Sequence, residues 1–318
     1  WRSEKTKYDY HLVIDSCYRE DLTAMVLRDR NHPCVISYSI GNEVIERKDI
    51  RVIHTAQTFK DVVTSLDPTR PVTEALCSWD SDWEIFDPHA AVLDIVGYNY
   101  MMHKAESDHL RCPERVMWQT ESYPRDAFAN WKHTSERPYI IGDMVWTGLD
   151  YLGESAIGQF HYEGEQRGEH YQAKHFPYHG AYCGDVDITG WRKPISHYRD
   201  MLWNAKDGSP DIYLAVKEPD NYRNGHVTET LWSVWPTWES WNWSGWENKT
   251  IEAEIYTKAP KVRLYLNDSL VAERNVSIAS QYKAVIPLQY QPGTLKAVSL
   301  DADGNEVKES ILRPPPPP

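Results

Sequence analysis

Two glutamates at the ends of apolar runs are the strongest chemical signal in the sequence. The run Val35-Ile36-Ser37-Tyr38-Ser39-Ile40 leads through a glycine into Asn42-Glu43, and a second run, 115–119, leads through a threonine into Glu121. If both runs are parallel strands of a barrel, both carboxylates lie on the face that carries catalytic groups. Two carboxylates on one face, ~5–5.5 Å apart, can hydrolyse a glycosidic bond with retention.

Such a reaction needs the two carboxyl groups in different protonation states. The ionised group attacks the anomeric carbon, and the protonated group gives its proton to the leaving oxygen. Repulsion between two close carboxylates raises the pKa of one of them. Taken alone, Asn42-Glu43 has an equally good structural interpretation as a carboxylate at a helix N-terminus. The chemical hypothesis therefore depends on both glutamates.

The elements that would position these groups follow from the hydrophobic pattern. From residue 18 to about 205, short apolar runs alternate with helical stretches, as in repeated strand and helix units of a parallel sheet. Helices are predicted over 19–30 and 51–66, the second ending at Asp67-Pro68. Five parallel strands are predicted at 35–40, 71–73, 93–97, 115–119 and 139–142.

The pattern changes after the polar break at 206–210. Residues 250–256, 262–266 and 295–300 alternate by two, and Asn267-Asp268 and Asp303-Gly304-Asn305 are turn signals. A β-sandwich of roughly 100 residues is the natural interpretation. The terminal run Pro314 to Pro318 cannot join a sheet ladder, so we expect a disordered tail.

Composition and charge exclude several classes of function. The formal net charge is -13, with 34 Lys and Arg against 47 Asp and Glu, which disfavours nucleic-acid binding. No apolar run approaches the ~20 residues that cross a bilayer, so no membrane span is expected. Trp and Tyr number 14 and 20 against 5 Phe. These aromatics suit either stacking on sugar rings or a Trp-rich core and domain seam.

Neither a metal nor a cofactor is expected. The five cysteines include no CxxC pair, which indicates neither a zinc site nor a disulfide framework. A group of acids and histidines follows Glu154, but its spacing matches no zinc pattern, so a solvated loop is the favoured interpretation. Its members are His161, Glu163, Glu165, Glu169, His170, His175 and His179.

Several of these segments, taken together, resemble glycoside hydrolase family 2, the β-galactosidase group. Residues 28–43 resemble its acid/base signature, 97–100 its sixth strand, 120–122 its nucleophile strand and 142–154 its eighth strand with the following loop. The similarity continues through 183–187 and 192–194, and segments near 241–243 and 264–267 resemble its immunoglobulin-like domains. It covers nearly the whole chain, with the more specific motifs in the barrel part.

The resemblance implies a role for each candidate site residue. Glu43 would be the acid/base, Glu121 the nucleophile and Asn42 the ligand of the sugar 2-hydroxyl. Tyr100, or alternatively Tyr98, would hydrogen-bond the nucleophile, and Trp146 would form a wall of the sugar subsite. The structural alternative for these three aromatics is packing in the barrel rim.

The resemblance also implies an architecture. We expect an α/β fold: an incomplete TIM (β/α)8 barrel, strands 4 to 8, over residues 1–208, then an all-β immunoglobulin-like sandwich over 209–313 and the tail 314–318. Five strands cannot close an eight-stranded barrel. The missing N-terminal part of the same enzyme is therefore an expected partner, and a homo-oligomer is a further possibility. The chain alone is expected to be inactive.

The function predicted from the resemblance is hydrolysis of terminal non-reducing β-galactosides by double displacement. The alternatives are a β-glucuronidase or β-mannosidase of the same family, and a non-catalytic carbohydrate-binding fragment. The expected partner molecule is thus a carbohydrate. Because the sequence opens with Trp1 and no signal peptide is visible, localisation stays unknown, with the periplasm or secretion from a bacterium favoured over the cytoplasm.

Overall fold

In the computed structural model, described over residues 1–78, 81–165, 179–223 and 225–313, the chain divides into two units. The first unit comprises residues 1–122 and 132–144, and the second comprises 123–131 and the chain from 145 onward. The predicted boundary at residue 208 stays a prediction.

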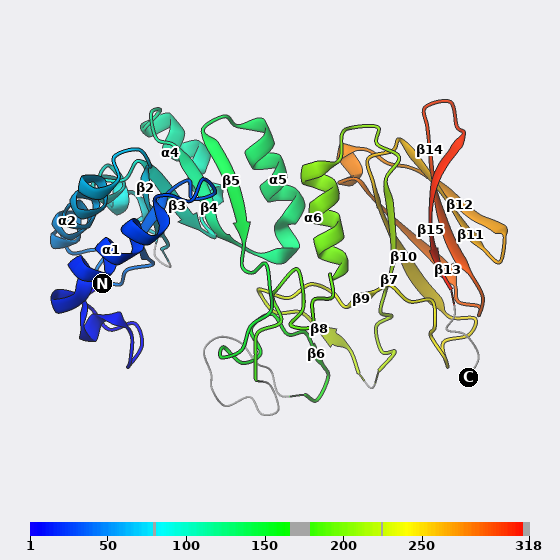
Figure 1. Ribbon diagram of the computed structural model, residues 1–318. Coiled ribbons are helices and arrows are strands. Elements are labelled where there is room, and N and C mark those ends of the chain that lie inside the picture. Colours follow the sequence, from blue (N-terminus) through cyan, green and yellow to red (C-terminus); the bar gives the residue numbers. More distant parts are fainter. Residues whose placement is uncertain (79–80, 166–178, 224, 314–318) are drawn as a thin grey trace. The chain divides into compact units, whose positions relative to one another are not determined.

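A five-stranded sheet forms the centre of the first unit, in the order β1-β2-β3-β4-β5 (Figure 1). The first three neighbouring pairs are parallel. Every residue of β2 and β3 is buried, as expected for parallel strands covered on both faces. The bounds are β1 Tyr38–Asn42, β2 Val72–Leu76, β3 Ile95–Asn99, β4 Met117–Ser122 and β5 Ile140–Val145.

All five predicted strands of this sheet are confirmed, but each begins and ends further along the chain. The ladder continues past the apolar runs into polar residues such as Asn42 and Glu121. Backbone pairing does not require an apolar side chain, so a strand that is predicted from hydrophobicity alone ends too early. The consequence is that the candidate site residues lie on or directly after the strands.

Helices accompany this sheet, and the longest two were predicted. The helix α2 begins at Arg51 and ends at Leu66 as expected, because Pro68 disfavours helical geometry at Asp67. The helix α1 starts five residues before its predicted first residue, 19. The helices of the first unit are α1 Ile14–Asp29, α2 Arg51–Leu66, α3 Asp87–Ala90 and α4 Ala105–Arg111, with 3-10 turns η1 Tyr10–Leu12, η2 Trp83–Phe86 and η3 Met102–Lys104. The helix α5 Ala127–Glu136 is divided between the two units, and the turn η4 Pro124–Asp126 belongs to the second.

The core of the first unit lies between the sheet and these helices. Val26 of α1 and Phe59 and Val63 of α2 pack with Val72 of β2 and Met117 of β4 in one buried cluster. Burial of a Val or Phe side chain contributes about 1.5–3 kcal/mol to stability. This packing fixes the strands whose ends carry the polar residues.

Two antiparallel four-stranded sheets dominate the second unit, with orders β13-β10-β7-β9 and β12-β11-β14-β15. Apolar side chains from both sheets belong to one buried cluster. The bounds are β7 Ile212–Lys217, β9 Thr237–Trp238, β10 Thr250–Thr257, β11 Lys261–Leu266, β12 Ser269–Asn275, β13 Lys283–Gln289, β14 Leu295–Leu300 and β15 Glu306–Leu312.

Three of these strands, β10, β11 and β14, were predicted, and both turn signals connect neighbouring strands. Asn267 and Asp268 have φ of 48° and 63°, as a two-residue type I′ hairpin turn requires. The remaining elements of the unit are the pair β6 His161–Tyr162 and β8 Val227–Thr228, the helix α6 Pro194–Asn204 and the turn η5 Ile278–Ser280.

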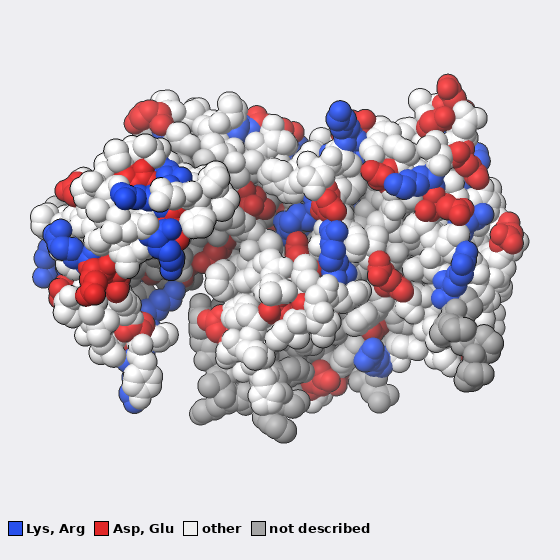
Figure 2. All heavy atoms as spheres, viewed as in Figure 1, with Lys and Arg blue, Asp and Glu red and all other residues white. Residues whose placement is uncertain are grey.

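The surface agrees with the acidic composition. On the face drawn in Figure 2, acidic and basic side chains are interspersed, without a large continuous basic patch. Among the described residues, no helix combines the length and apolar character of a membrane span. All five cysteines are free thiols, and Cys34 is exposed.

Candidate active site

Glu43 and Glu121 lie at the same edge of the parallel sheet. The N–H of Glu43, directly after β1, donates to the carbonyl of Ala75 in β2 at 2.9 Å. Glu121 is near the end of β4, and its carbonyl accepts from the Tyr100 N–H at 2.8 Å. Because β1 to β4 run in one direction, these strand ends meet along one edge.

A single amide lies next to both glutamates. Asn99, the last residue of β3, is fully buried, and its Nδ2 donates to Oε1 of Glu43 and to Oδ1 of Asn42, both at 3.0 Å. The Thr120 hydroxyl donates to Oδ1 of Asn99 at 2.6 Å and fixes the orientation of the amide. Asn99 is also paired with Glu121 on the neighbouring strand β4, and its side chain lowers the pKa of the Glu121 carboxyl. Both carboxyl groups are therefore neighbours of one side chain.

Tyr100 holds the second carboxylate from another side. Its hydroxyl donates to Oε2 of Glu121 at 2.7 Å. Tyr100 and Glu43 both have left-handed backbone, with φ of 59° and 49°. Such a conformation costs a non-glycine residue about 1–3 kcal/mol and persists where the surroundings impose it, often at functional sites. Here the bend at each strand end directs a polar side chain toward the shared edge.

The Glu121 carboxyl has a strongly raised pKa. Burial is the main cause that raises this pKa, and the charge of Glu43 also raises it, while the hydrogen bond from Tyr100, the charge of Lys5 and the Asn99 side chain lower it, with a net pKa of about 7. Close carboxylates are expected to disturb each other in this way. The raised pKa thus falls on the residue that the resemblance makes the nucleophile.

Glu43 has an ionic partner of its own. Nζ of Lys5 lies 2.8 Å from Oε2 of Glu43, whose side chain is almost completely buried. Burial, together with the charge of Glu43, raises the pKa of the neighbouring Cys77 thiol, which therefore stays neutral. Glu43, Asn42 and Lys5 also line a cavity of ≈ 420 Å³ within the first unit. One side of Glu43 is thus open to a bound molecule.

Four of the six candidate residues are brought together: Asn42, Glu43, Tyr100 and Glu121. Tyr98 needs a correction. Its side chain is fully buried and its hydroxyl donates to Oδ2 of Asp108 at 2.7 Å, so it does not contact the proposed nucleophile. Side chains alternate along a strand, and Tyr98 points to the face opposite Asn99.

Trp146 belongs to the second unit. Its ring meets Tyr151 edge-on with centroids 6.0 Å apart, and it packs against a small buried cluster that includes Ile157 and Cys183. A role as a wall of the sugar subsite stays a prediction.

The loop after Glu154 is described only in part. Residues 166–178, which include Glu169, His170 and His175, lie outside the described residues. Among those that are described, no three His, Cys, Asp or Glu side chains are grouped so that they could hold a metal ion.

Sequence reasoning missed three residues of this site: Lys5, Asn99 and Thr120. Asn99 carried a usable signal, because it ends an apolar run just as Glu43 and Glu121 do. Lys5 had none, since its contact with Glu43 joins segments that no motif connects.

Comparison with known proteins identifies two matching domains. The family described as "Glycosyl hydrolases family 2, TIM barrel domain" matches residues 11–175, and a domain of unknown function matches residues 248–308. The chain is 24% identical over 388 residues to a β-galactosidase of Bacteroides ovatus, BoGH2A, covering 98% of this chain but 40% of that protein. A putative β-glucuronidase of Formosa agariphila is 22% identical and covers 93% of this chain and 29% of that protein.

Among solved structures, a glycosyl hydrolase family 2 member from Bacteroides cellulosilyticus is similar over nearly the whole chain. The TM-score is 0.87 at 33% sequence identity, and the match covers 98% of this chain and 39% of that one. The chain thus spans well under half the length of the proteins that it matches.

Proposed function

Because the chain belongs to glycosyl hydrolase family 2, we propose that it carries the catalytic carboxylates of a retaining β-glycosidase that releases terminal β-linked galactose. The observation that carries this proposal is the position of Asn99, which hydrogen-bonds the carboxyl group of Glu43 at 3.0 Å and is paired with Glu121 on the neighbouring strand. Two carboxyl groups this close, on the ends of parallel strands, suit a double displacement on one sugar ring.

In the first step of the proposed mechanism, ionised Glu121 forms a bond to the anomeric carbon. The glycosidic bond breaks at the same time, and Glu43 gives its proton to the leaving oxygen. In the second step, Glu43 takes a proton from water, the water oxygen attacks the anomeric carbon, and the bond to Glu121 breaks. The hydrogen bond from Tyr100 holds Oε2 of Glu121 and orients the carboxylate for attack. Asn42 would bind the 2-hydroxyl.

The first step requires an ionised Glu121, and the raised pKa of this carboxyl, about 7, opposes its ionisation below neutral pH. Lys5 stabilises the ionised form of Glu43, which is the form that the second step requires. For the first step the proton has to reside on Glu43, so the bound substrate would have to weaken the contact between Lys5 and Glu43.

Galactose is the proposed sugar because the relative that covers 98% of this chain is a β-galactosidase. The putative β-glucuronidase among the relatives makes a uronide the main alternative, with a β-mannoside as a further one. A panel of nitrophenyl β-glycosides given to the whole protein separates these sugars. The galactoside should be turned over fastest, and a preference for the glucuronide would overturn the assignment.

We also infer that β1 to β5 are strands 4 to 8 of an eight-stranded barrel and that the two later sheets form an immunoglobulin-like sandwich. The match to a TIM-barrel family and the open order of the five-stranded sheet support the first inference. The antiparallel pairing around one core supports the second. On this basis the chain alone should hydrolyse no glycoside.

The catalytic roles are tested by substitution in the whole protein. Glu121→Gln should abolish turnover of every substrate, because no nucleophile remains. Glu43→Ala should preserve the rate of the first step for substrates with good leaving groups, such as 2,4-dinitrophenyl glycosides, because these leave without a proton from Glu43. The exposed Glu114→Gln is the matched control and should leave the rates unchanged. Equal losses for the Glu121 and Glu43 variants on all leaving groups would contradict the roles.

A further inference from the structure

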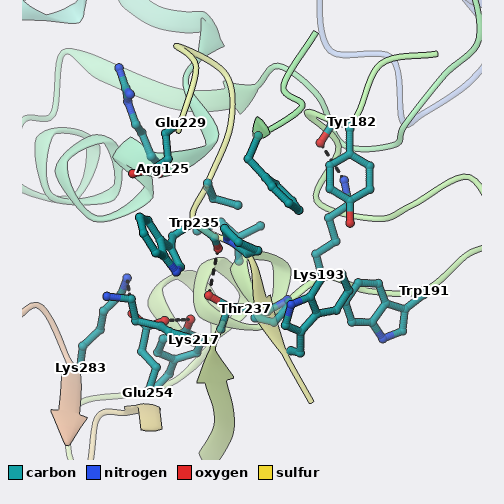
Figure 3. Close-up of a pocket in the computed structure, with 17 residues that line it drawn as sticks. Arg125, Tyr182, Trp191, Lys193, Lys217, Glu229, Trp235, Thr237, Glu254 and Lys283 are labelled. Carbon is teal, nitrogen blue, oxygen red and sulfur yellow. Dashed lines mark hydrogen bonds and ion pairs between the residues drawn. The ribbon is translucent and has the colours of Figure 1, made fainter. Parts of the chain in front are cut away.

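A second pocket lies entirely within the second unit and shares no lining residue with the cavity beside Glu43. Its volume is ≈ 240 Å³. In Figure 3, Trp235 lies on one side of the pocket and Trp191 with Tyr182 on the other. The aromatic side chains that line it are Phe160, Tyr182, Trp191, Trp235, Trp238 and Tyr256.

Two of its indole rings are fixed by one buried residue. Glu218 is 1% exposed, and its Oε2 accepts from Nε1 of Trp238 at 2.9 Å. Its backbone carbonyl accepts from Nε1 of Trp235, also at 2.9 Å. The polar atom of each indole is therefore satisfied inside the protein, while both rings remain partly exposed. Rings held in this way lose little conformational entropy when a ligand binds.

A third indole continues the aromatic surface. The rings of Trp191 and Trp238 are almost parallel, with an interplanar angle of 13° and centroids 6.0 Å apart. Flat, rigid aromatic faces are the surfaces on which the apolar face of a small ring can be buried. Hydrophobic walls with a few convergent polar groups are typical of small-molecule sites.

The charged groups of the pocket are largely neutralised by partners. Nζ of Lys217 lies 2.8 Å from Glu252, and Nζ of Lys193 lies 2.8 Å from Asp150. The Lys283 ammonium lies 3.5 Å from the Glu254 carboxylate. The lining therefore offers hydrogen-bond donors and acceptors without a strong excess of one charge. An uncharged ligand with several hydroxyl groups matches this lining better than an anion.

We propose that this pocket is a second, non-catalytic binding site for an uncharged hexopyranose unit of an oligosaccharide. The carbon face of the sugar packs on the indoles of Trp235 and Trp238. Its hydroxyl groups bond Lys217, Glu254 and the exposed Glu229. The site would hold the chain near a polymeric carbohydrate, independently of bond cleavage.

The test measures binding with hydrolysis abolished. The full chain carrying Glu121→Gln is titrated with galactose, lactose and soluble β-1,4-galactan, and tryptophan fluorescence and calorimetry are recorded. Saturable binding of at least the galactan is expected. A further Trp235→Ala substitution should weaken it roughly tenfold or more, as truncation of a central aromatic anchor does. Trp203→Ala, at a 41% exposed tryptophan of α6 outside the pocket, is the control and should not change the affinity.

A second variant tests the same pocket in case the Trp235→Ala variant does not fold. Glu229 is exposed, so Glu229→Ala should fold normally and still lower the affinity about threefold or more through a lost hydrogen bond. The proposal is overturned if none of the three probes binds. It is also overturned if the Trp235→Ala and Trp203→Ala variants bind with equal affinity. Since catalysis is switched off, these outcomes do not depend on the proposed hydrolase activity.

Discussion

Removal of the titrating group at Glu121 should change the pH dependence of stability. The pKa of this carboxyl is about 7 in the folded chain, against an ordinary value of 4.5. The unfolded chain therefore releases the proton near pH 4.5, whereas the folded chain keeps it until about pH 7. Because the pKa is raised on folding, the stabilising contribution is complete below pH 4.5 and is lost as the pH rises through 7.

The size of this loss follows from the same two pKa values. At about 1.4 kcal/mol for each pKa unit, the wild-type free energy of unfolding should fall by about 3 kcal/mol between pH 4 and pH 8 from this group. Glu121→Gln cannot titrate, so this part of the fall is absent. The stability of the variant relative to wild type should therefore increase by about 3 kcal/mol across that range.

Urea unfolding of the full chain, followed by circular dichroism at several pH values, measures this difference. Glu114→Gln is the matched control, because the same substitution at an exposed position should give a curve parallel to wild type. A Glu121→Gln curve that also runs parallel to wild type would refute the raised pKa and, with it, the burial and charge coupling deduced for the pair.

Three further outcomes are expected. Tyr100→Phe removes the 2.7 Å hydrogen bond to Glu121 and should raise the pKa of that carboxyl by about one unit, measured by ¹³C NMR; an unchanged pKa contradicts the contact. Phe59→Ala, on the buried face of α2, should lower the free energy of unfolding measured in urea by about 3–5 kcal/mol, and a loss below 1 kcal/mol would argue against the burial of Phe59. Asp268→Gly, at a φ of 63°, should raise stability by about 0.5 kcal/mol. Asp303→Gly serves as the control. If both substitutions change the melting temperature equally, the left-handed backbone at Asp268 is not the cause of the gain in stability.

Much of the first unit was predictable because its elements have strong local signals. The helix α2 has an apolar face and a proline stop, so both its ends were predicted correctly. The five strands were recognised as apolar runs, but their last residues were not, since the polar ends that carry Glu43 and Glu121 pair through the backbone alone.

The candidate site shows where local reasoning stops. Glu43 and Glu121 were found because each follows an apolar run, yet Asn99 was passed over although it follows such a run as well. The choice between Tyr98 and Tyr100 depends on which face of the strand each side chain takes and on the left-handed backbone at Tyr100. No residue pattern encodes that bend. The contact between Lys5 and Glu43 joins residues 38 positions apart in the sequence, so only the three-dimensional structure reveals it.

The central claim is that Glu121 attacks the sugar, and covalent trapping tests it most directly. The whole protein is incubated with 2-deoxy-2-fluoro-β-D-galactosyl fluoride, digested and analysed by peptide mass spectrometry. A fluorosugar ester on Glu121 is the predicted result, with no label when Glu121→Gln is treated in the same way. A label on Glu43 or on another residue, or rapid hydrolysis of a good substrate without a covalent adduct under any trapping condition, would contradict the account.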